Sequence, residues 1–433
     1  MTLPPPLSQR RSVPILTADP ASANVTIDFS SSGPQLPATL WGVSGFDNPT
    51  DPFGELVKFP QTMLAQLSHQ KFGSLRIPAT AMLSHAFAQG NTAVMDDFFS
   101  TIQPRVLLEG GRLVIGIGWA PDATPDIAAA EAVAFLNAMH DQDRVIADIE
   151  VGNEPIGAVS DYLGFFNAIT DAVHQQVDPT IKVFGPIGSS WNSVDIAQFV
   201  AGVGTRSPVG FGWHSAPFTA DDTADMDKVY AAAAGFAEPA SVRQALAGTP
   251  MQNVELAIGQ HCMNDADQGL VQDGGYQGAI VTALTIAAAA QSDAKLMMQG
   301  WSLCAPGTYF SLTGNLVFGD DQTKLPPRAF YLSQASQIMP GAKLTATTTE
   351  SKLQVLGTRN GSSWSLQLVN FDTAATPLTA KIAVTGGSVQ ALMVNRWDIG
   401  SGNQFAPGIS TTSNLAGLLL PAQGVTILQG HVA

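Results

Sequence analysis

Positive charge is scarce in this sequence of 433 residues, and it lacks long apolar segments. It contains 20 lysine and arginine residues against 35 aspartate and glutamate residues, which gives a formal net charge of -15. A nucleic acid is a polyanion and would be repelled by this excess of negative charge. No run of about 18 apolar residues is present that would cross a membrane. We therefore expect neither a nucleic acid nor a membrane as partner.

Cysteine is equally scarce, with Cys262 and Cys304 as the only two. Two cysteines cannot build a disulfide framework, and no spacing of cysteine or histidine is typical of a zinc site. Both lie near the ends of neighbouring predicted strands. This leaves two interpretations open, a single disulfide in an exported protein or two buried thiols.

Three common catalytic motifs are also missing. The sequence has no P-loop glycine motif, no His-Glu-x-x-His and no Gly-x-Ser-x-Gly. Nucleotide-binding, zinc-protease and lipase sites therefore lack their usual residues. We expect no cofactor and no metal, and a neutral small molecule or a polysaccharide fits the composition better as ligand.

What the sequence does contain is a repeated alternation of short apolar runs with longer helical stretches. Its 45% hydrophobic and 13% charged residues suit a compact protein with a large core. Eight apolar runs, most of them followed by a helical segment, are typical of βα units around a parallel sheet. We therefore predict an α/β fold, a (β/α)8 TIM barrel. The predicted strands are 39–44, 74–78, 113–118, 146–153, 181–186, 209–214, 254–260 and 296–301, and the predicted helices are 60–69, 95–108, 125–140, 160–176, 224–247 and 277–291.

The pattern changes after residue 340, where short β-rich runs alternate with turn signals such as Asn360-Gly361 and Gly386-Gly387. These runs predict a small C-terminal β-sandwich that braces the barrel, with sugar binding as the alternative role. The early run 24–29 has the same character and is predicted to pair with that sheet. The predicted sandwich strands are 353–358, 363–370, 380–384, 388–394 and 424–428. The predicted division is an N-terminal extension at 1–22, a strand of the C-terminal domain at 23–30, the barrel at 31–340 and the β-sandwich at 341–433.

A carboxylate follows the predicted fourth strand directly, in the tripeptide Asn153-Glu154-Pro155. Pro155 cannot donate to a sheet and biases Glu154 away from helix, so the strand ends there and leaves Glu154 at its mouth. Catalytic groups of such barrels lie at the C-terminal strand ends. Glu154 is therefore a candidate general acid, against the plain alternative of a strand end that happens to carry glutamate.

Tryptophan is frequent at the same predicted strand ends. An indole can stack on the apolar face of a sugar ring, although any single tryptophan is better explained by core packing. Four at one rim favour a carbohydrate site. The four are Trp119, Trp191, Trp213 and Trp301.

Together these features resemble a clan A glycoside hydrolase over the whole chain. The resemblance is carried by Asn-Glu-Pro on the fourth strand, Arg76 on the second, His214 at the end of the sixth, Trp301 on the eighth and the segment 316–330. The N-terminal strand that joins a C-terminal sandwich, and the helix entry at 273–279, most resemble family 39, which includes xylosidases and related exo-acting enzymes. Family 79, the glucuronidase and heparanase group, is the second choice.

The resemblance implies a retaining double displacement. Glu154 would protonate the leaving oxygen, and a carboxylate at the end of the seventh strand would attack the anomeric carbon. In this sequence Gln260 stands where that nucleophilic glutamate is expected. An amide has nearly the shape of a carboxylate but is a far weaker nucleophile, so this chain is expected to be inactive as a hydrolase and still able to bind sugar.

Three explanations of Gln260 stay open. The one we favour is an altered, substrate-trapping form whose nucleophilic glutamate was replaced. In the second, Gln260 is natural, and the protein either only binds sugar or uses Asp265 or Asp267 of the following loop. In the third, Glu255 is the nucleophile; this is disfavoured because five residues continue the strand beyond it, which places Glu255 near the N-terminal end of the barrel.

Supporting roles are expected for other residues of this rim. Asn153 should hydrogen-bond the 2-hydroxyl of the sugar, unless it only caps the strand. Arg76 should orient residue 260 through its fork of donors, with a structural ion pair as the alternative. His214 should contact residue 260 or the sugar, unless it is a satisfied core histidine. The other substrate-binding candidates are Trp119, Trp191, His261, Asn264, Tyr276 and Trp301.

The predicted function is therefore a retaining β-glycoside hydrolase acting on a glycoside or oligosaccharide. Exo action is expected because the segments 217–252 and 265–275 would narrow the cleft. The alternative is a naturally noncatalytic carbohydrate-binding relative, and an unrelated reaction on the same barrel is a distant third. Residues 1–11 lack the apolar core of a secretory signal. From the substrate class we expect a secreted or periplasmic protein whose signal is not part of this chain, with a cytoplasmic location as the alternative.

Overall fold

A computed structural model describes most of the chain. The described residues are 21–45, 70–79, 82–92, 96, 98–155, 158–190, 192–218, 225–263, 275–292, 294–303, 327–374, 377–389, 393–400 and 408–432. The helix predicted at 60–69 lies outside these ranges. So do Cys304 and therefore the predicted pairing of the two cysteines. Within the described ranges, no helix is both long and apolar enough to span a membrane.

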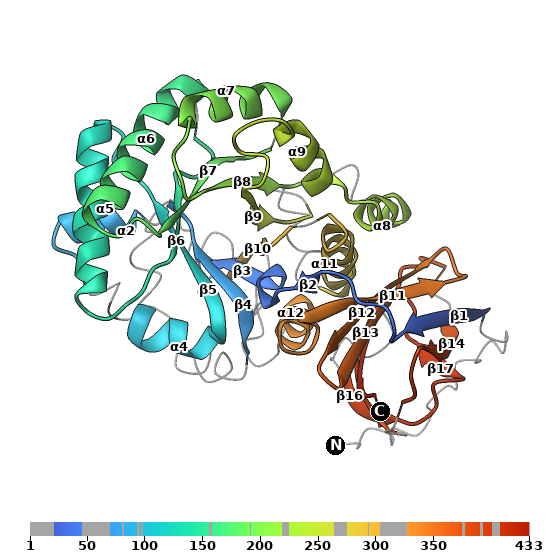
Figure 1. Cartoon of the computed structure of the whole chain (residues 1–433). Helices are drawn as coiled ribbons and strands as arrows, with labels where there is room; N and C mark the ends of the chain where they lie inside the picture. Colours follow the sequence, from blue (N-terminus) through green and yellow to red (C-terminus); the bar gives the residue numbers. More distant parts are fainter. Residues whose placement is uncertain are drawn as a thin grey trace, which may run out of the picture.

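Eight parallel strands within the described residues close into a barrel, in the order β10-β3-β4-β5-β6-β7-β8-β9 (Figure 1). This confirms the predicted (β/α)8 fold, and each predicted strand coincides with one of the eight. The strands are β3 (Gly42–Gly45), β4 (Phe72–Ile77), β5 (Leu107–Ile117), β6 (Asp148–Val151), β7 (Lys182–Gly188), β8 (Val209–Ser215), β9 (Glu255–His261) and β10 (Leu296–Leu303).

The helices surround this barrel, as Figure 1 shows most clearly for α5, α6 and α7. Two predicted helices were wrong in part. The segment 95–108 ends earlier than predicted, because β5 already begins at Leu107. The segment 224–247 is two helices, because Gly235 caps the end of the first and Pro239 lies in the first turn of the second. The helices are α2 (Leu83–Ala88), α4 (Gln103–Val106), α5 (Pro125–His140), α6 (Val159–Gln176), α7 (Ser193–Val203), α8 (Met226–Ala234), α9 (Glu238–Leu246), α11 (Tyr276–Ala289) and α12 (Pro327–Ile338), with a 3-10 turn η1 (Ala38–Leu40) and a π-helical turn η3 (Phe98–Ile102).

A ten-stranded mixed sheet forms the second domain, in the order β16-β15-β18-β13-β12-β11-β1-β14-β17 with β2 beside β11. Of the strand predicted at 388–394, residues 390–392 lie outside the described ranges; Val389 forms an isolated bridge to Val432, and strand β15 begins at Val394. The strands are β1 (Ala21–Asp28), β2 (Gln35–Leu36), β11 (Gly341–Thr348), β12 (Leu353–Asn360), β13 (Ser363–Asn370), β14 (Leu378–Thr385), β15 (Val394–Gly400), β16 (Gly408–Thr412), β17 (Leu418–Leu420) and β18 (Gly424–His431).

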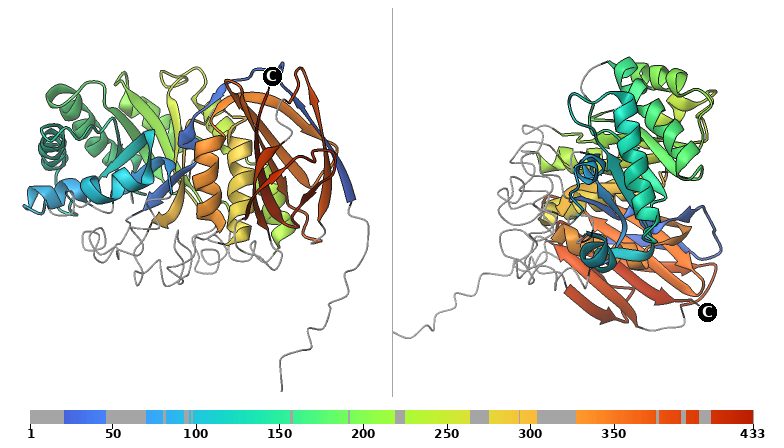
Figure 2. Two further views of the ribbon diagram at one scale, coloured as in Figure 1. Left: turned by 90° about the horizontal axis from the view of Figure 1, so that it is seen from below. Right: turned by 90° about the vertical axis from the view of Figure 1, so that its left-hand side faces the viewer.

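The first described strand of the chain belongs to this second domain. β1 pairs antiparallel with β11 and parallel with β14, and it appears in blue among the orange and red strands in both views of Figure 2. The polypeptide then leaves the sheet, builds the whole barrel and returns at β11. The barrel is thus enclosed in sequence by strands of one sheet.

Helices α11 and α12 lie between the barrel and the sheet (Figure 1). Every residue of α11 from Gly278 to Ala289 is buried, as expected for a helix that is apolar on all sides. A buried hydrogen-bond chain crosses the same layer: Trp41 Nε1 donates to the Tyr331 hydroxyl at 3.2 Å, and that hydroxyl donates to Gln367 Oε1 at 2.8 Å. One face of the sheet therefore belongs to the same core as the barrel, and a second cluster packs within the sheet domain itself.

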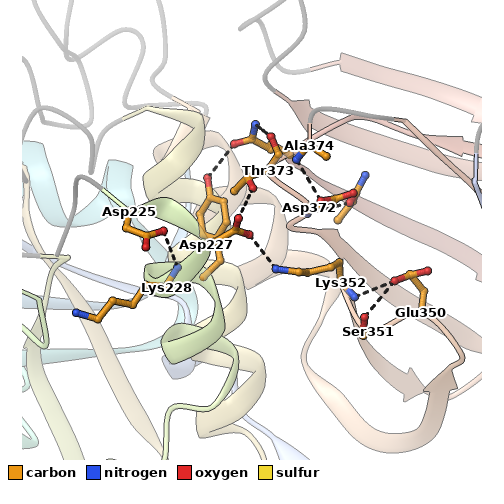
Figure 3. A network of polar contacts seen from close by, with 12 residues as sticks. Asp225, Asp227, Lys228, Glu350, Ser351, Lys352, Asp372, Thr373 and Ala374 are labelled. Carbon is orange, nitrogen blue, oxygen red and sulfur yellow. Dashed lines mark hydrogen bonds and ion pairs between the residues drawn. The ribbon is translucent and has the colours of Figure 1, made fainter.

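A second, more exposed set of contacts ties α8 to the sheet (Figure 3). Asp227 accepts hydrogen bonds from Lys352 Nζ at 2.8 Å and from the Thr373 hydroxyl at 2.7 Å. The Tyr230 hydroxyl lies 3.5 Å from Gln423 Oε1 in the turn before β18. These contacts hold the helix that follows β8 against loops of the second domain.

Candidate active site

Polar groups lie at both ends of the barrel interior, with an apolar layer between them. The apolar cluster consists of Val114, Phe184, Ile187, Ala257, Leu296 and Met298. Strand β6 shows how the sequence produces this arrangement: Asp148 and Glu150 face ionic partners, whereas Ile149 and Val151 belong to the hydrophobic core outside the barrel wall. Side chains of a strand alternate between its two faces. Glu150 therefore lies on the inner face like Asp148, two residues closer to the C-terminal end of the strand.

Arg76 on β4 is the centre of the polar group at the C-terminal end. Its side chain is fully buried. Nε donates to both Glu150 oxygens at 2.7 and 2.9 Å, and Nη1 donates to Ser44 Oγ at 3.0 Å. Nη2 donates to Asn153 Oδ1 at 2.7 Å and lies 3.0 Å from His214 Nε2. These contacts use the planar fork of the guanidinium to join strands β3, β4, β6 and β8.

The pair of Arg76 and Glu150 is tightly coupled. Burial raises the pKa of Glu150, and the charge and hydrogen bonds of Arg76 oppose this rise. A buried charge without a partner is very costly, so the pair is best understood as one unit. The hydrogen bonds described for Arg76 do not include one to Gln260, the residue that it was expected to orient.

Glu154 follows the end of β6 in an unusual backbone conformation. Its φ is +47°, and Gly152 before it has φ of +77°. The Glu154 amide donates to the Ile187 carbonyl of the neighbouring strand at 2.9 Å, and the Gly152 amide donates to the Ile117 carbonyl at 3.0 Å. A non-glycine residue at positive φ is uncommon and costs conformational energy. The hydrogen bonds to the two flanking strands hold this segment in that conformation.

The Glu154 side chain contacts His214 on β8. Oε1 lies 2.6 Å from His214 Nδ1, and the side chain of Glu154 is 38% exposed whereas that of His214 is 3% exposed. The hydrogen bond from His214 lowers the pKa of Glu154; burial acts in the opposite direction, and the charge of Arg76 lowers it further. Glu154 is therefore an ionised carboxylate at neutral pH in this chain.

Gln260 lies on β9, beside His214 on β8. The register between these strands shifts after Trp213, so that Trp213 pairs with Ile258 and His214 pairs with Gln260, leaving Gly259 as the extra residue. Partners in a register share a face, and a one-residue slip moves a side chain to the other face. The bulge at Gly259 therefore turns Gln260 to the same inner face as His214. Gln260 is buried.

The site residue Trp119 lies at the end of β5, on the other side of Asn153. Its indole stacks on Phe165 with ring centroids 4.3 Å apart and 7° between the planes. A pocket of about 330 Å³ opens beside it and is lined by Ala79, Met82, Gly118, Trp119, Gly152, Asn153 and Pro155. One indole face is thus fixed by Phe165, and the residue borders a hollow next to the site.

Trp213 and His261, two residues considered for the rim, are buried away from it, and a third, Tyr276, lies at the start of α11. Trp213 is fully buried outside the barrel wall and donates from Nε1 to Glu238 Oε2 at 2.9 Å, so the expectation that it stacks on a sugar was wrong. His261 is buried with Nδ1 3.2 Å from Gln299 Oε1, and burial lowers its pKa to about 4. Tyr276 begins α11 and packs against the main core.

Glu255 lies at the opposite end of the barrel. It forms ion pairs with Arg112 and Lys182, and Arg112 also pairs with Asp148. Burial acts to raise the pKa of Glu255, but Arg112 and Lys182 lower it overall. This position agrees with the argument from strand length, which placed Glu255 far from the C-terminal ends.

Some predicted residues lie outside the described part of the chain. Trp191, Asn264, Asp265 and Asp267 are among them, and nothing is described of the Trp301 side chain. Sequence reasoning missed Glu150 and Ser44, the two partners that fix Arg76 from inside the barrel. The signal for Glu150 was present, because an isolated charge within an apolar strand requires a buried partner. Among the described residues, no group of three or more acidic, histidine or cysteine side chains is arranged to hold a metal ion.

No family model matches this sequence, and no curated protein matches it. Solved structures match over nearly the whole chain. A glucosidase from Croceicoccus marinus has a TM-score of 0.66 at 14% identity, covering 95% of this chain and 100% of that one. A family 39 β-xylosidase from Caulobacter crescentus has a TM-score of 0.65 at 14% identity, covering 94% and 99%. A family 44 xyloglucanase from Paenibacillus polymyxa has a TM-score of 0.63 at 10% identity, covering 95% and 100%. This chain thus shares the fold of these glycoside hydrolases, a barrel with an attached β-domain.

Proposed function

We propose that this protein has the active site of a retaining β-glycoside hydrolase. Glu154 is the acid and base, and position 260 is where the nucleophile belongs. The observation that carries the proposal is the placement of Glu154. Its carboxylate is the exposed end of a buried chain, Glu150–Arg76–His214–Glu154, at the C-terminal end of a barrel. Such ends carry the catalytic groups of TIM-barrel enzymes.

Gln260 is the point at which the site departs from a complete hydrolase. A carboxylate here would attack the anomeric carbon while Glu154 gives its proton to the leaving oxygen, and Glu154 would then take a proton from the water that releases the sugar. An amide cannot form that glycosyl ester. The lowered pKa of Glu154 points the same way, because an acid must hold its proton and a second nearby carboxylate would raise this pKa.

The test is hydrolysis of aryl β-glycosides by this chain and by its Gln260→Glu variant. The substrates are aryl β-xylosides and β-glucosides, chosen because solved structures of this fold include a β-xylosidase and a glucosidase. Activity in the variant alone is the expected result. Activity already present in the given chain means that another residue attacks, and silence from both favours the second function below.

The second candidate is a carbohydrate-binding protein without hydrolytic activity, and Gln260 is the observation that favours it. Such a protein would bind glycosides with equal affinity whether residue 260 is glutamine or glutamate. Calorimetric titration with a cationic transition-state analogue beside an uncleaved thioglycoside separates the two candidates, because a hydrolase site binds its transition state better than its ground state. We also propose exo action, from the segments 217–252 and 265–275 that would narrow the cleft, and export from the cell, from the substrate class.

A further inference from the structure

Arg76 restricts where protons can reside in this site. A guanidinium has five N–H donors, has no acceptor and does not lose its proton in proteins. Its Nη2 lies 3.0 Å from His214 Nε2 in a fully buried contact. Two donors cannot make a hydrogen bond to each other, so His214 Nε2 must be the acceptor and carry no proton.

The proton of His214 must then reside on the other ring nitrogen. Nδ1 lies 2.6 Å from Glu154 Oε1, a distance at which an N–H donates to a carboxylate. A second proton on Nε2 would point at the guanidinium and add a like charge beside it. The described titratable and charged groups that face this imidazole are Arg76 from β4, with Glu150 behind it, and Glu154. Strand β9 approaches the ring with Gly259, which has no side chain; an added Cβ there would lie 3.4 Å from Nε2.

We propose that Arg76 is a positioning residue that holds His214 in its neutral, Nδ1-protonated form, so that Glu154 Oε1 always accepts and only Oε2 carries the proton given to the leaving group. The part of this inference that concerns proton transfer to a leaving group rests on the proposed function. The state of His214 itself does not depend on it.

The geometry of Glu154 fits this division between its two oxygens. Oε1 is directed to a histidine that is 3% exposed, whereas the Glu154 side chain as a whole is 38% exposed. The proton leaves Oε2 for the glycosidic oxygen as the bond to the anomeric carbon breaks, and Glu154 becomes a carboxylate whose Oε1 bond to His214 is unchanged. No other proton has to move in that step.

The state of His214 is measured directly by long-range ¹H–¹⁵N correlation spectra of protein labelled at histidine. The seven histidines are separated by comparison with a His214→Gln variant, which lacks one set of signals. The expected result for the unchanged chain is a protonated Nδ1 and an unprotonated Nε2, from about pH 8 down to about pH 5.5, below the ordinary value for histidine. A protonated Nε2 at neutral pH, or an imidazolium there, overturns the proposal.

His85 provides an internal reference in the same spectra. Its Nδ1 also faces a carboxylate, Glu131 Oε1 at 3.0 Å, and no arginine contact to its ring is described. Its signals show how an imidazole next to a glutamate responds to pH without a guanidinium at the second nitrogen. Identical behaviour of His85 and His214 contradicts the role given to Arg76.

Arg76→Lys tests the cause, because an ammonium cannot reach Glu150, Asn153 and His214 together. In a folded variant the His214 tautomer should become mixed or reversed. Ser44→Ala is the matched control, since it removes one contact of Arg76 without touching His214. A folded Arg76→Lys protein with the original tautomer overturns the proposal, and if that variant does not fold, the spectrum of the unchanged chain decides alone.

The two proposals fail in different ways. Loss of the proposed function appears as an inactive Gln260→Glu variant, while the tautomer is read from spectra without any substrate. With an active Gln260→Glu protein, adding Arg76→Lys should shift the alkaline limb of the pH profile, which reports loss of the Glu154 proton, whereas adding Ser44→Ala should leave it in place. An unchanged limb in the folded Arg76→Lys double variant contradicts the role of Arg76.

Discussion

Burial and neighbouring groups change the pKa values of three glutamates of this chain in three different ways. Glu150 is enclosed and paired with Arg76 alone among its described charged contacts, so burial dominates and its pKa is raised. Glu255 meets two cations at the base of the barrel, and they lower its pKa despite burial. Glu154 keeps one side in solvent and takes a hydrogen bond from His214, which lowers its pKa. At the scale of single residues, the partner decides the role.

The pKa of Glu154 should rise in the Gln260→Glu variant. A carboxylate at the retaining distance, about 5 to 5.5 Å, disfavours a second negative charge. The measurement is titration of the ¹³C-labelled glutamate carboxyl carbons in both proteins, with Gln142→Glu as control because it adds the same charge at an exposed loop. Equal values of the Glu154 pKa in the two proteins contradict this prediction.

Glu255→Gln should lower stability without changing catalysis. The folded pKa of Glu255 is lowered, so its contribution is present above its unfolded pKa and is lost as the pH falls through the folded value. Loss of this partly buried acceptor should cost about 1–3 kcal/mol at pH 7 and less in acid, as measured by urea unfolding at both pH values. In a Gln260→Glu background kcat/KM should stay unchanged; a large loss there would make Glu255 the nucleophile after all.

At the scale of elements, the sequence predicted those helices and strands whose bounds depend on residues close together in the chain. Helix α5 has its predicted bounds because Thr124 caps it and Pro125 opens it. The eight strands were visible as apolar runs. The pairing of Arg76 with Glu150, 74 positions apart, was not visible, because it depends on which strands the closed barrel brings together. The bulge that turns Gln260 inward could not be predicted, because its only sign in the sequence is Gly259 and many glycines do not form a bulge.

Gly300→Ala on β10 should disturb residue 260. An added Cβ would lie 2.5 Å from Gln260 Cγ, so the Gln260 side chain or one of the two strands must shift. We expect a cost of about 1–3 kcal/mol from overpacking and a lower kcat in the Gln260→Glu background. Gly430→Ala is the matched control, since its Cβ would lie 2.8 Å from the Trp364 ring in the sheet domain. A comparable fall in kcat from both would show that the effect is general destabilisation.

At the scale of the whole molecule, the two domains should unfold together. Tyr331→Phe removes the hydroxyl that serves both Trp41 and Gln367, and the loss in this buried layer should cost about 1–3 kcal/mol. Asp227→Asn alters the exposed contact with Lys352 and should have a smaller, salt-dependent effect. Calorimetry should show one transition in both variants. Two separate transitions in Tyr331→Phe would mean that the shared core does not couple the domains.

The pairing of β1 with β11 and β14 also affects how this chain is made. The backbone amide of Asn24 donates a hydrogen bond to the Thr349 hydroxyl, 325 positions further along the chain. During synthesis β1 leaves the ribosome early and waits, with an unpaired strand edge, until nearly the whole barrel has been translated. The sheet cannot be completed before its last strands emerge. The edge of this early strand is therefore open to wrong pairing with other chains until the last strands emerge.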